Sequence, residues 1–296
     1  MLSIPGMLLN QENTKMSPGG KFVIIGKGFI FEKHAQAIKE IRGEIVDIVD
    51  KSQGEKAWKN MVQNTKADYV VILAPNNLHF EMAKFVAEKG KMVLCEKPLT
   101  IKSKEAKILA KYPDIFTVCQ LRYHPLVKKL KSEIKKDKKY EIGMDISVHR
   151  DEDYLKSWKG KIERSGGILF NIGIHYFDLL LYLFGEPIEI LTKSLTDRRG
   201  EGVIKGKNYL CSWKISAEEA IENQRRLFKI NGTNYDFSSK TELPKEAKVK
   251  MRRKFSSPEN FHSYVYKDLL EEKGVSPKEA LKSIELIEKI YENFKK

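Results

Sequence analysis

Between residues 21 and 121 the sequence alternates short, continuously apolar runs with longer segments of mixed polarity. Runs rich in β-branched residues predict strands at 22–25, 45–49, 69–73, 92–95 and 115–119. The mixed segments between them predict helices at 31–41, 55–65, 78–89 and 104–111. A strand that is apolar along its whole length has both faces buried, which is typical of a parallel sheet covered by helices on both sides. With right-handed crossovers, this part of the chain is predicted to be a doubly wound α/β domain of the Rossmann type.

The pattern changes after residue 122. Polar and apolar residues alternate over 141–150 and in parts of 188–195 and 209–215, and the dipeptide Asn231–Gly232 suits a tight hairpin turn between 227–230 and 235–237. We therefore predict a mostly antiparallel open sheet, followed by an amphipathic helix over 277–294. The expected organisation is a loose N-terminal extension (1–20), a Rossmann domain (21–121) and a C-terminal α+β domain (122–296).

The chain carries 54 Lys+Arg against 40 Asp+Glu, a formal net charge of +14. Such an excess is compatible with a nucleic-acid partner, a membrane surface, an anionic small molecule or a solvated surface. No segment resembles a recognition helix or an aromatic-basic platform, and the most apolar stretch, 168–184, is interrupted by Asn171, His175 and Asp178. We therefore expect neither a nucleic-acid partner nor a membrane span, and keep a non-catalytic nucleotide- or nucleic-acid-binding protein as a remote alternative.

The three cysteines, Cys95, Cys119 and Cys211, lie too far apart in sequence for a zinc ribbon or a CxxC redox pair. They are also too few for a disulfide framework, which is consistent with a reducing compartment. We expect a cytoplasmic protein without a bound metal.

A glycine-rich turn follows the first predicted strand. Gly26 permits the tight turn and Gly28 lets the backbone approach a pyrophosphate at the N-terminus of the next helix, although Phe31 replaces the third glycine of the fingerprint. Asp50 ends the second predicted strand, where its carboxylate would accept hydrogen bonds from a ribose 2′-hydroxyl and repel a 2′-phosphate. This pattern favours NAD over NADP; the alternative is that Asp50 only closes a turn.

Polar motifs also end the third and fourth predicted strands. Asn76 and His79 follow the third strand, and Glu96-Lys97-Pro98 follows the fourth. Because the carboxyl ends of parallel strands form the ligand-binding edge of an open sheet, these side chains are expected to lie near one another. A Lys–Pro peptide bond can be cis, which would aim Lys97 into a cleft.

A third motif places Gly166–Gly167 before Asn171, His175 and Asp178. If the segment is helical from Asn171 onward, these three polar residues fall at i, i+4 and i+7, on one face. His175 is then either a core histidine bonded to Asp178 or a general base that faces a cleft.

Taken together, in this order and spacing, these motifs resemble the glucose–fructose oxidoreductase / inositol dehydrogenase / MocA family of NAD(P)-dependent oxidoreductases over residues 21–296. Asn171 stands where most members have aspartate. That departure, with the runs QLRYH at 120–124 and YLKSWKG at 154–160, is similar to one branch, the UDP-N-acetylglucosaminuronate 3-dehydrogenases. Members of this branch supply diaminouronic acids for bacterial surface polysaccharides such as lipopolysaccharide O-antigen.

The resemblance implies hydride transfer from the C3′ hydroxyl of a UDP-linked N-acetylated uronic acid to NAD+. It implies a catalytic set of Lys97, His175 and Asn171, with His175 as base and Lys97 as its electrostatic partner; the reverse assignment is the alternative. The implied NAD contacts are Gly26, Gly28, Phe29, Ile30, Asp50, Asn76, His79, Glu96, Lys97 and Gln120. The implied substrate contacts are Lys97, Arg122, Tyr154, Lys156, Ser165, Asn171 and His175.

Three further expectations follow from the resemblance. 2-Oxoglutarate is a candidate acceptor for regenerating NAD+, the chain is expected to form a homo-oligomer (dimer or tetramer), and a free sugar or cyclitol is the alternative substrate. The other histidines that we considered, His34, His149 and His262, give no functional signal in the sequence.

Overall fold

The structure is a computed structural model that describes residues 19–236 and 261–294. Most of the expected N-terminal extension, residues 1–18, lies outside the described residues, as do residues 237–260 and 295–296.

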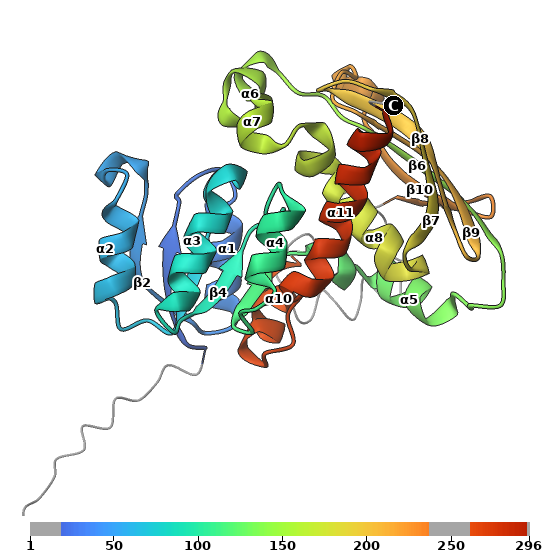
Figure 1. Cartoon of the computed structure of the whole chain (residues 1–296). Helices are drawn as coiled ribbons and strands as arrows, with labels where there is room; N and C mark the ends of the chain where they lie inside the picture. The colour runs from blue at the N-terminus through green and yellow to red at the C-terminus, as the bar shows by residue number, and fades with distance from the viewer. Residues whose placement is uncertain (1–18, 237–260, 295–296) are drawn as a thin grey trace, which may run out of the picture.

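The first half is the parallel sheet that the sequence predicts. The strands are β1 (Lys21–Ile25), β2 (Glu44–Val49), β3 (Tyr69–Ile72), β4 (Met92–Cys95) and β5 (Ile115–Thr117). Helices α1 (Phe31–Glu40), α2 (Ala57–Asn64), α3 (His79–Glu88) and α4 (Ser103–Leu109) connect them (Figure 1). The strand order is β2-β1-β3-β4-β5, with every neighbouring pair parallel. The order reverses between β1 and β3, and this switch point is where open α/β sheets bind ligands.

The second half contains the expected open sheet, ordered β11-β10-β6-β9-β8-β7 and antiparallel except for the β6–β9 pair. Its strands are β6 (Tyr140–Ser147), β7 (Pro187–Leu195), β8 (Arg199–Gly206), β9 (Tyr209–Ser216), β10 (Arg225–Ile230) and β11 (Thr233–Asp236). Asn231 and Gly232, both with positive φ, form the predicted hairpin turn. The sequence did not predict β8, because Gly200 and Gly202 interrupt its alternation. The ring of Trp213 occupies the space next to both glycines.

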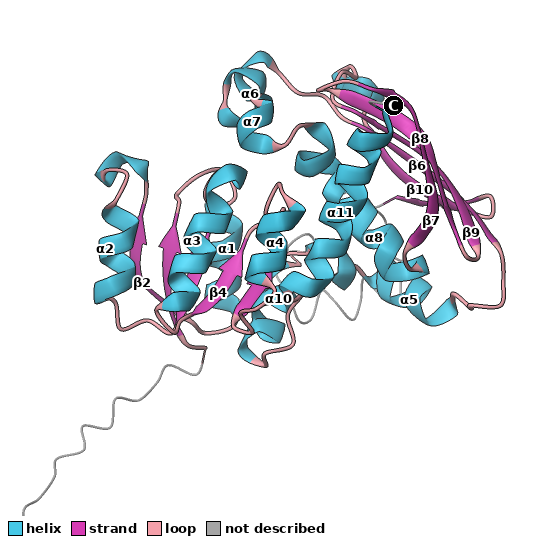
Figure 2. Ribbon diagram, in the orientation of Figure 1, coloured by secondary structure: helices cyan, strands magenta, loops and turns pink. Residues whose placement is uncertain are grey.

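Helices fill the space between the two sheets (Figures 1 and 2). They include α5 (Pro125–Glu133), α8 (Ile174–Phe184) and α11 (Pro277–Phe294), while the short helices α6 (Glu152–Lys156) and α7 (Ile162–Ser165) lie at the top of Figure 1. Phe177 of α8 packs edge-on against Trp213 of β9, with ring centroids 5.5 Å apart. The segment Ile162–Phe184 is long and apolar enough to cross a membrane, but 72% of its most apolar window is buried inside this fold. Its apolar character is therefore explained by core packing.

One further helix, α10 (His262–Leu270), returns to the first sheet. The ring of Tyr266 lies edge-on to Phe22 of β1, with centroids 5.5 Å apart, and both residues are fully buried. The division expected from the sequence assigns this helix to the C-terminal domain, whereas its side chains pack in the core of the first. Cys95, Cys119 and Cys211 are free thiols in this fold.

Candidate active site

A cleft of about 680 Å³ opens at the carboxyl edge of the parallel sheet, between the two halves of the chain. Side chains from the strand ends, the segment 148–159 and the start of α8 line it. Many of the residues implied by the family resemblance meet there: Gly28, Phe29, Ile30, Asn76, His79, Glu96, Lys97, Gln120, Tyr154, Asn171 and His175. The tertiary structure thus assembles most of the predicted site from sequence motifs more than 140 residues apart.

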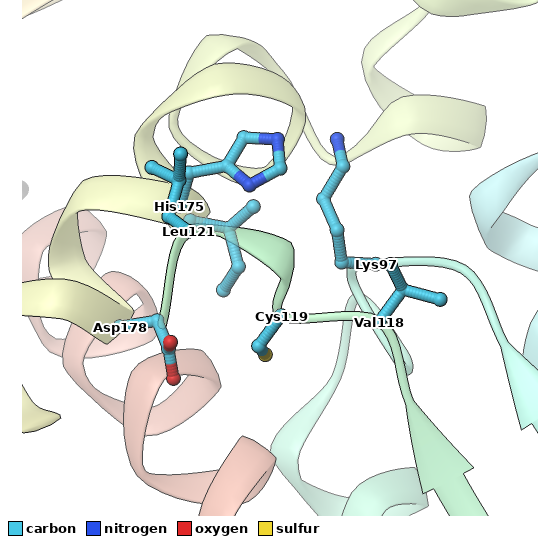
Figure 3. A pocket seen from close by; sticks show the side chains of 7 residues that line it. Lys97, Val118, Cys119, Leu121, His175 and Asp178 are labelled. Atoms are coloured by element: carbon cyan, nitrogen blue, oxygen red, sulfur yellow. The ribbon is translucent and has the colours of Figure 1, made fainter. Parts of the chain in front are cut away.

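Lys97 and His175 point to the same side of the site, whereas Asp178 and Cys119 point away from it (Figure 3). The Lys97–Pro98 peptide is cis, and the Lys97 ammonium group donates a hydrogen bond to the carbonyl of Asn171 over 2.9 Å. A hollow of about 10 Å³ beneath these side chains has room for no more than about one water molecule.

The electrostatic surroundings of these two groups suit proton transfer. Burial lowers the pKa of Lys97, although the neighbouring Glu96 carboxylate opposes that shift. Burial and the charge of Lys97 hold the pKa of His175 well below its ordinary value. Near neutral pH, the imidazole of His175 is therefore uncharged and able to accept a proton.

The expected alignment of Asn171, His175 and Asp178 on one helix face is not what the structure shows. Residues Leu169–Gly173 form a π-helical turn, and the regular helix α8 begins only at Ile174. The wider turn changes the angular spacing on which the i, i+4 prediction depended. π-Turns often occur at functional sites, and here one places Asn171 beside the cleft.

Asn171 connects three segments around the site. Its amide group donates to the carbonyl of Lys159 over 3.0 Å, and its side-chain oxygen accepts from Asn76 over 3.4 Å. Its own carbonyl holds Lys97. Through these contacts, Asn171 holds Lys97 in place and joins Lys159 and Asn76 in the wall of the cleft.

Arg122, expected at the substrate, occupies a different place. Its Nε and Nη2 donate to the carboxylate of Asp178 over 2.9 and 2.7 Å, and its Nη1 donates to Glu279 of α11 over 2.8 Å. The guanidinium also lies over the ring of Tyr182, 4.9 Å from its centroid. Arg122 therefore joins α8 to α11 and does not line the cleft, and Asp178 pairs with Arg122 in place of His175.

Two other predicted substrate contacts also lie outside the lining of the cleft. Ser165 is fully buried, where its hydroxyl accepts from the amide of Gly167 over 3.1 Å and its carbonyl accepts from Asn76 over 2.8 Å. Lys156 is exposed and pairs with Glu152 over 2.8 Å. Ser165 shapes the turn before the π-helical segment, and Lys156 is a surface lysine.

The glycine-rich turn fits a dinucleotide. Gly26 has φ +106°, and a Cβ there would lie 2.7 Å from the carbonyl oxygen of Leu73, so only glycine fits. Gly28 is exposed and a Cβ there would meet nothing within 4 Å, so its backbone is open to a phosphate group. Asp50 follows β2 and closes the next turn, since its Oδ1 accepts from the amide and the hydroxyl of Ser52 over 2.8 and 2.5 Å. Its other oxygen has no hydrogen bond within the described part of the chain and can accept from a ribose.

Two buried polar atoms in the cleft wall lack a hydrogen-bond partner among the described residues, which indicates that a bound ligand supplies one. Gln120 Oε1 and Arg150 Nε have no hydrogen-bond partner among residues 19–236 and 261–294. Since buried polar atoms in native proteins are nearly always paired, a ligand donor is expected at Gln120 and a ligand acceptor at Arg150. The carboxamide of a nicotinamide ring is a donor of the first kind, so the residues present fit NAD.

Of the cations among the described residues that line the cleft, the sequence analysis identified only Lys97. The cations that it missed are Lys33, Arg150, Lys159 and Arg226. The Lys159 ammonium lies 5.1 Å from the ring centroid of Phe29 in the glycine-rich turn and 5.6 Å from that of Tyr154. Arg150 stacks on Tyr154 at 4.8 Å. In the sequence, only Lys159 carried a signal, because it lies inside the run 154–160 that supports the family resemblance. The other missed cations have no sequence feature that distinguishes them from the rest of the 54 Lys+Arg.

Comparison with known proteins gives consistent matches. Residues 20–114 match the model described as the oxidoreductase family with an NAD-binding Rossmann fold, and residues 139–221 match the GFO/IDH/MocA C-terminal domain. Among curated proteins, the glucose-6-phosphate 3-dehydrogenase of Bacillus subtilis is 30% identical over 209 residues, 62% of this chain and 58% of that protein. The myo-inositol 2-dehydrogenase of Thermotoga maritima is 27% identical over 56% of this chain and 55% of that protein. The chain thus matches little more than half the length of these relatives.

Among solved structures, the WlbA (WbpB) dehydrogenase of Thermus thermophilus in complex with NAD and UDP-GlcNAcA has a TM-score of 0.75 and 25% sequence identity. The match covers 90% of this chain and 92% of that one. The same dehydrogenase in complex with NAD and alpha-ketoglutarate has a TM-score of 0.76.

Proposed function

The chain belongs to the GFO/IDH/MocA family of NAD-dependent oxidoreductases, and on that premise we propose that it oxidises the C3′ hydroxyl of a UDP-linked N-acetylated uronic acid. The observation that carries the proposal is the charge of the cleft. Among the residues that the structure describes, five cationic side chains line it against the single carboxylate of Glu96. A substrate with a diphosphate and a uronate supplies negative charge that matches that excess, whereas a neutral cyclitol supplies none.

The similarity to the Thermus thermophilus WlbA dehydrogenase supports the same substrate class, because that protein was solved with NAD and UDP-GlcNAcA. Its second complex, with alpha-ketoglutarate, supports 2-oxoglutarate as the acceptor that regenerates NAD+ here. A dicarboxylate also suits the cationic lining of the cleft.

In the proposed reaction, His175 accepts the proton of the substrate hydroxyl, because its ring is neutral and it lines the cleft. Lys97 donates a hydrogen bond to the same oxygen and stabilises the negative charge that develops there. Its ammonium group is held in the cleft by the carbonyl of Asn171. When bound, NAD+ supplies the acceptor for the hydride that leaves the same carbon. Gly28, Asp50 and Gln120 would hold the coenzyme.

A substrate comparison tests the proposal. We expect NADH to form with NAD+ and UDP-N-acetylglucosaminuronate, in a single turnover or continuously when 2-oxoglutarate is added, and at most weak turnover with glucose 6-phosphate or myo-inositol. Lys159→Met should raise KM for the UDP-sugar roughly tenfold, since it removes one partly buried charge pair. The exposed Lys161→Met is the matched control and should leave KM unchanged. Efficient turnover of a free sugar or cyclitol, with none of the UDP-sugar, contradicts the proposal.

Oxidation of a smaller sugar or a cyclitol is the second candidate function. It is favoured by the curated relatives, which include the glucose-6-phosphate and myo-inositol dehydrogenases named above. A preference for glucose 6-phosphate over the UDP-sugar in the same assay supports this candidate.

Coenzyme choice gives a separate prediction. Asp50→Ser is expected to raise the affinity for NADP relative to NAD by roughly tenfold or more, because it removes the charge that repels a 2′-phosphate. Serine also caps a short helical turn, so the fold of Lys51–Gln53 should be kept. Dissociation constants measured by fluorescence of NADH and NADPH provide the check. An unchanged NAD/NADP ratio means that Asp50 acts only on the turn.

A further inference from the structure

A buried polar cluster lies directly behind the cleft. His34 of α1, Glu96 after β4 and His262 at the start of α10 bring their side chains together. His34 Nε2 lies 3.0 Å from Glu96 Oε1, His262 Nε2 lies 3.7 Å from the same oxygen, and the two imidazole rings are 4.8 Å apart. His34 and His262 are 0% and 3% exposed, so both belong to the interior. The reaction as described above uses neither histidine.

The contacts of Glu96 connect this cluster to Lys97. Glu96 Oε2 accepts a hydrogen bond from the backbone amide of Lys97 over 3.1 Å, while Oε1 faces the two histidines. The carboxylate is thus held at both oxygens. Its position fixes the backbone from which the Lys97 side chain enters the cleft.

The proton positions in the cluster follow from its chemistry. Burial lowers the pKa of His34. Burial alone would raise the pKa of Glu96, but the neighbouring imidazoles of His262 and His34 and the charge of Lys97 hold it well below its ordinary value. A neutral imidazole has one N–H, and an ionised carboxylate can only accept, so His34 carries its proton on Nε2. His34 Nδ1 then accepts from the hydroxyl of Tyr266, which lies 2.8 Å away.

We propose that His34 is a positioning residue for Lys97, acting through Glu96, and that Tyr266 of α10 fixes the tautomer that this role requires. Hydrogen bonds run in one direction, from Tyr266 to His34 to Glu96, and the amide of Lys97 donates to the other oxygen of Glu96. Helix α10, which follows α1 by more than 200 residues, is thereby coupled to the reaction centre. This inference rests on the proposed function only in the assumption that Lys97 acts on the reacting hydroxyl.

Three variants test the positioning role by kinetics, with whichever sugar the enzyme oxidises. His34→Leu removes the donor to Glu96 and should lower kcat roughly tenfold, because a small displacement of a catalytic group is costly, with Kd for NADH changed by less than about twofold. His34→Gln keeps a side-chain N–H and should recover most of the rate. Tyr266→Phe is nearly isosteric and should give an intermediate loss. The proposal is overturned if His34→Leu keeps a normal kcat. It is also overturned if His34→Gln loses as much kcat as His34→Leu does.

A second measurement needs no substrate and therefore separates this inference from the proposed function. Long-range ¹⁵N–¹H correlation spectra of the full chain should show His34 as the neutral Nε2–H tautomer, and Tyr266→Phe should weaken that preference. An Nδ1–H tautomer or an imidazolium in the wild type overturns the proposal. So does stoichiometric binding of Zn²⁺ that is lost in His262→Gln, since the cluster would then be a metal site with a deprotonated His34 Nε2. Failure of the proposed function appears instead as an absence of turnover with the UDP-sugar while these spectra are as expected.

Discussion

Lys97→Met is expected to lower kcat by roughly 10³-fold while leaving the affinity for NADH nearly unchanged. Methionine has a similar length and fills the same space, so the variant removes the ammonium group without opening a cavity. The loss arises because nothing else described in the cleft donates to the substrate oxygen from this position. Steady-state kinetics and NADH fluorescence titration measure the two quantities, with the exposed Lys161→Met as a control that should keep full activity.

His175→Asn should cause a loss of similar size, because it removes the base while keeping a polar side chain. The two substitutions act on one proton transfer, so the double variant is expected to be little worse than either single variant. A retained kcat in either single variant removes that residue from its proposed role.

The pH dependence separates the two possible assignments of the base. If His175 is the base, kcat/KM rises as the pH passes the pKa of His175, below its ordinary value of about 6.5. It falls as Lys97 loses its proton, at a pH below the ordinary lysine pKa of about 10.4. His175→Asn then removes the acidic limb. A profile that rises only through the pKa of Lys97, with an alkaline plateau, assigns the base to Lys97.

Arg122→Met is expected to lower the free energy of unfolding by about 3 to 5 kcal/mol, because it leaves the carboxylate of Asp178 buried without its partner. The side chains of Arg122 and Asp178 are only 12% and 7% exposed, so water cannot replace the lost hydrogen bonds. Denaturant unfolding monitored by circular dichroism provides the measurement.

Arg225→Met is the matched control for that prediction. Arg225 pairs with Asp145 over 2.6 Å, but the two side chains are 32% and 36% exposed. Arg225→Met should therefore lower the free energy of unfolding by at most about 1 kcal/mol. Adding Asp178→Asn to Arg122→Met should recover part of the stability. Equal losses for the two arginine variants would contradict the assignment of Arg122 to a buried structural pair.

Much of the fold was predictable because its signals are local. The apolar run of β4 and the Asn231–Gly232 turn each depend on a few neighbouring residues, and both predictions are confirmed. Lys97, next to a proline at a strand end, could be predicted in the cleft for the same reason, since the edge of a parallel sheet is fixed by strand direction. β8 was missed because its glycines suit the ring of Trp213, which lies on a neighbouring strand.

The parts that the sequence did not predict depend on contacts between distant segments. Arg122 resembled a substrate residue until Asp178 and Glu279 were placed beside it. His34 and His262 gave no signal, because a histidine is informative only once its neighbours are known.

By itself, the sequence determined the alternation of strands and helices in the first half of the chain, the dinucleotide turn and the strand-end position of Lys97, because hydrophobic periodicity and turn chemistry act over a few residues. The tertiary structure alone decided which cations face the cleft, that His175 is free of Asp178, and that Tyr266 of α10 reaches Glu96 through His34. The physical reason is that charge pairing, burial and hydrogen bonding depend on distances in space, which residue spacing along a chain does not fix.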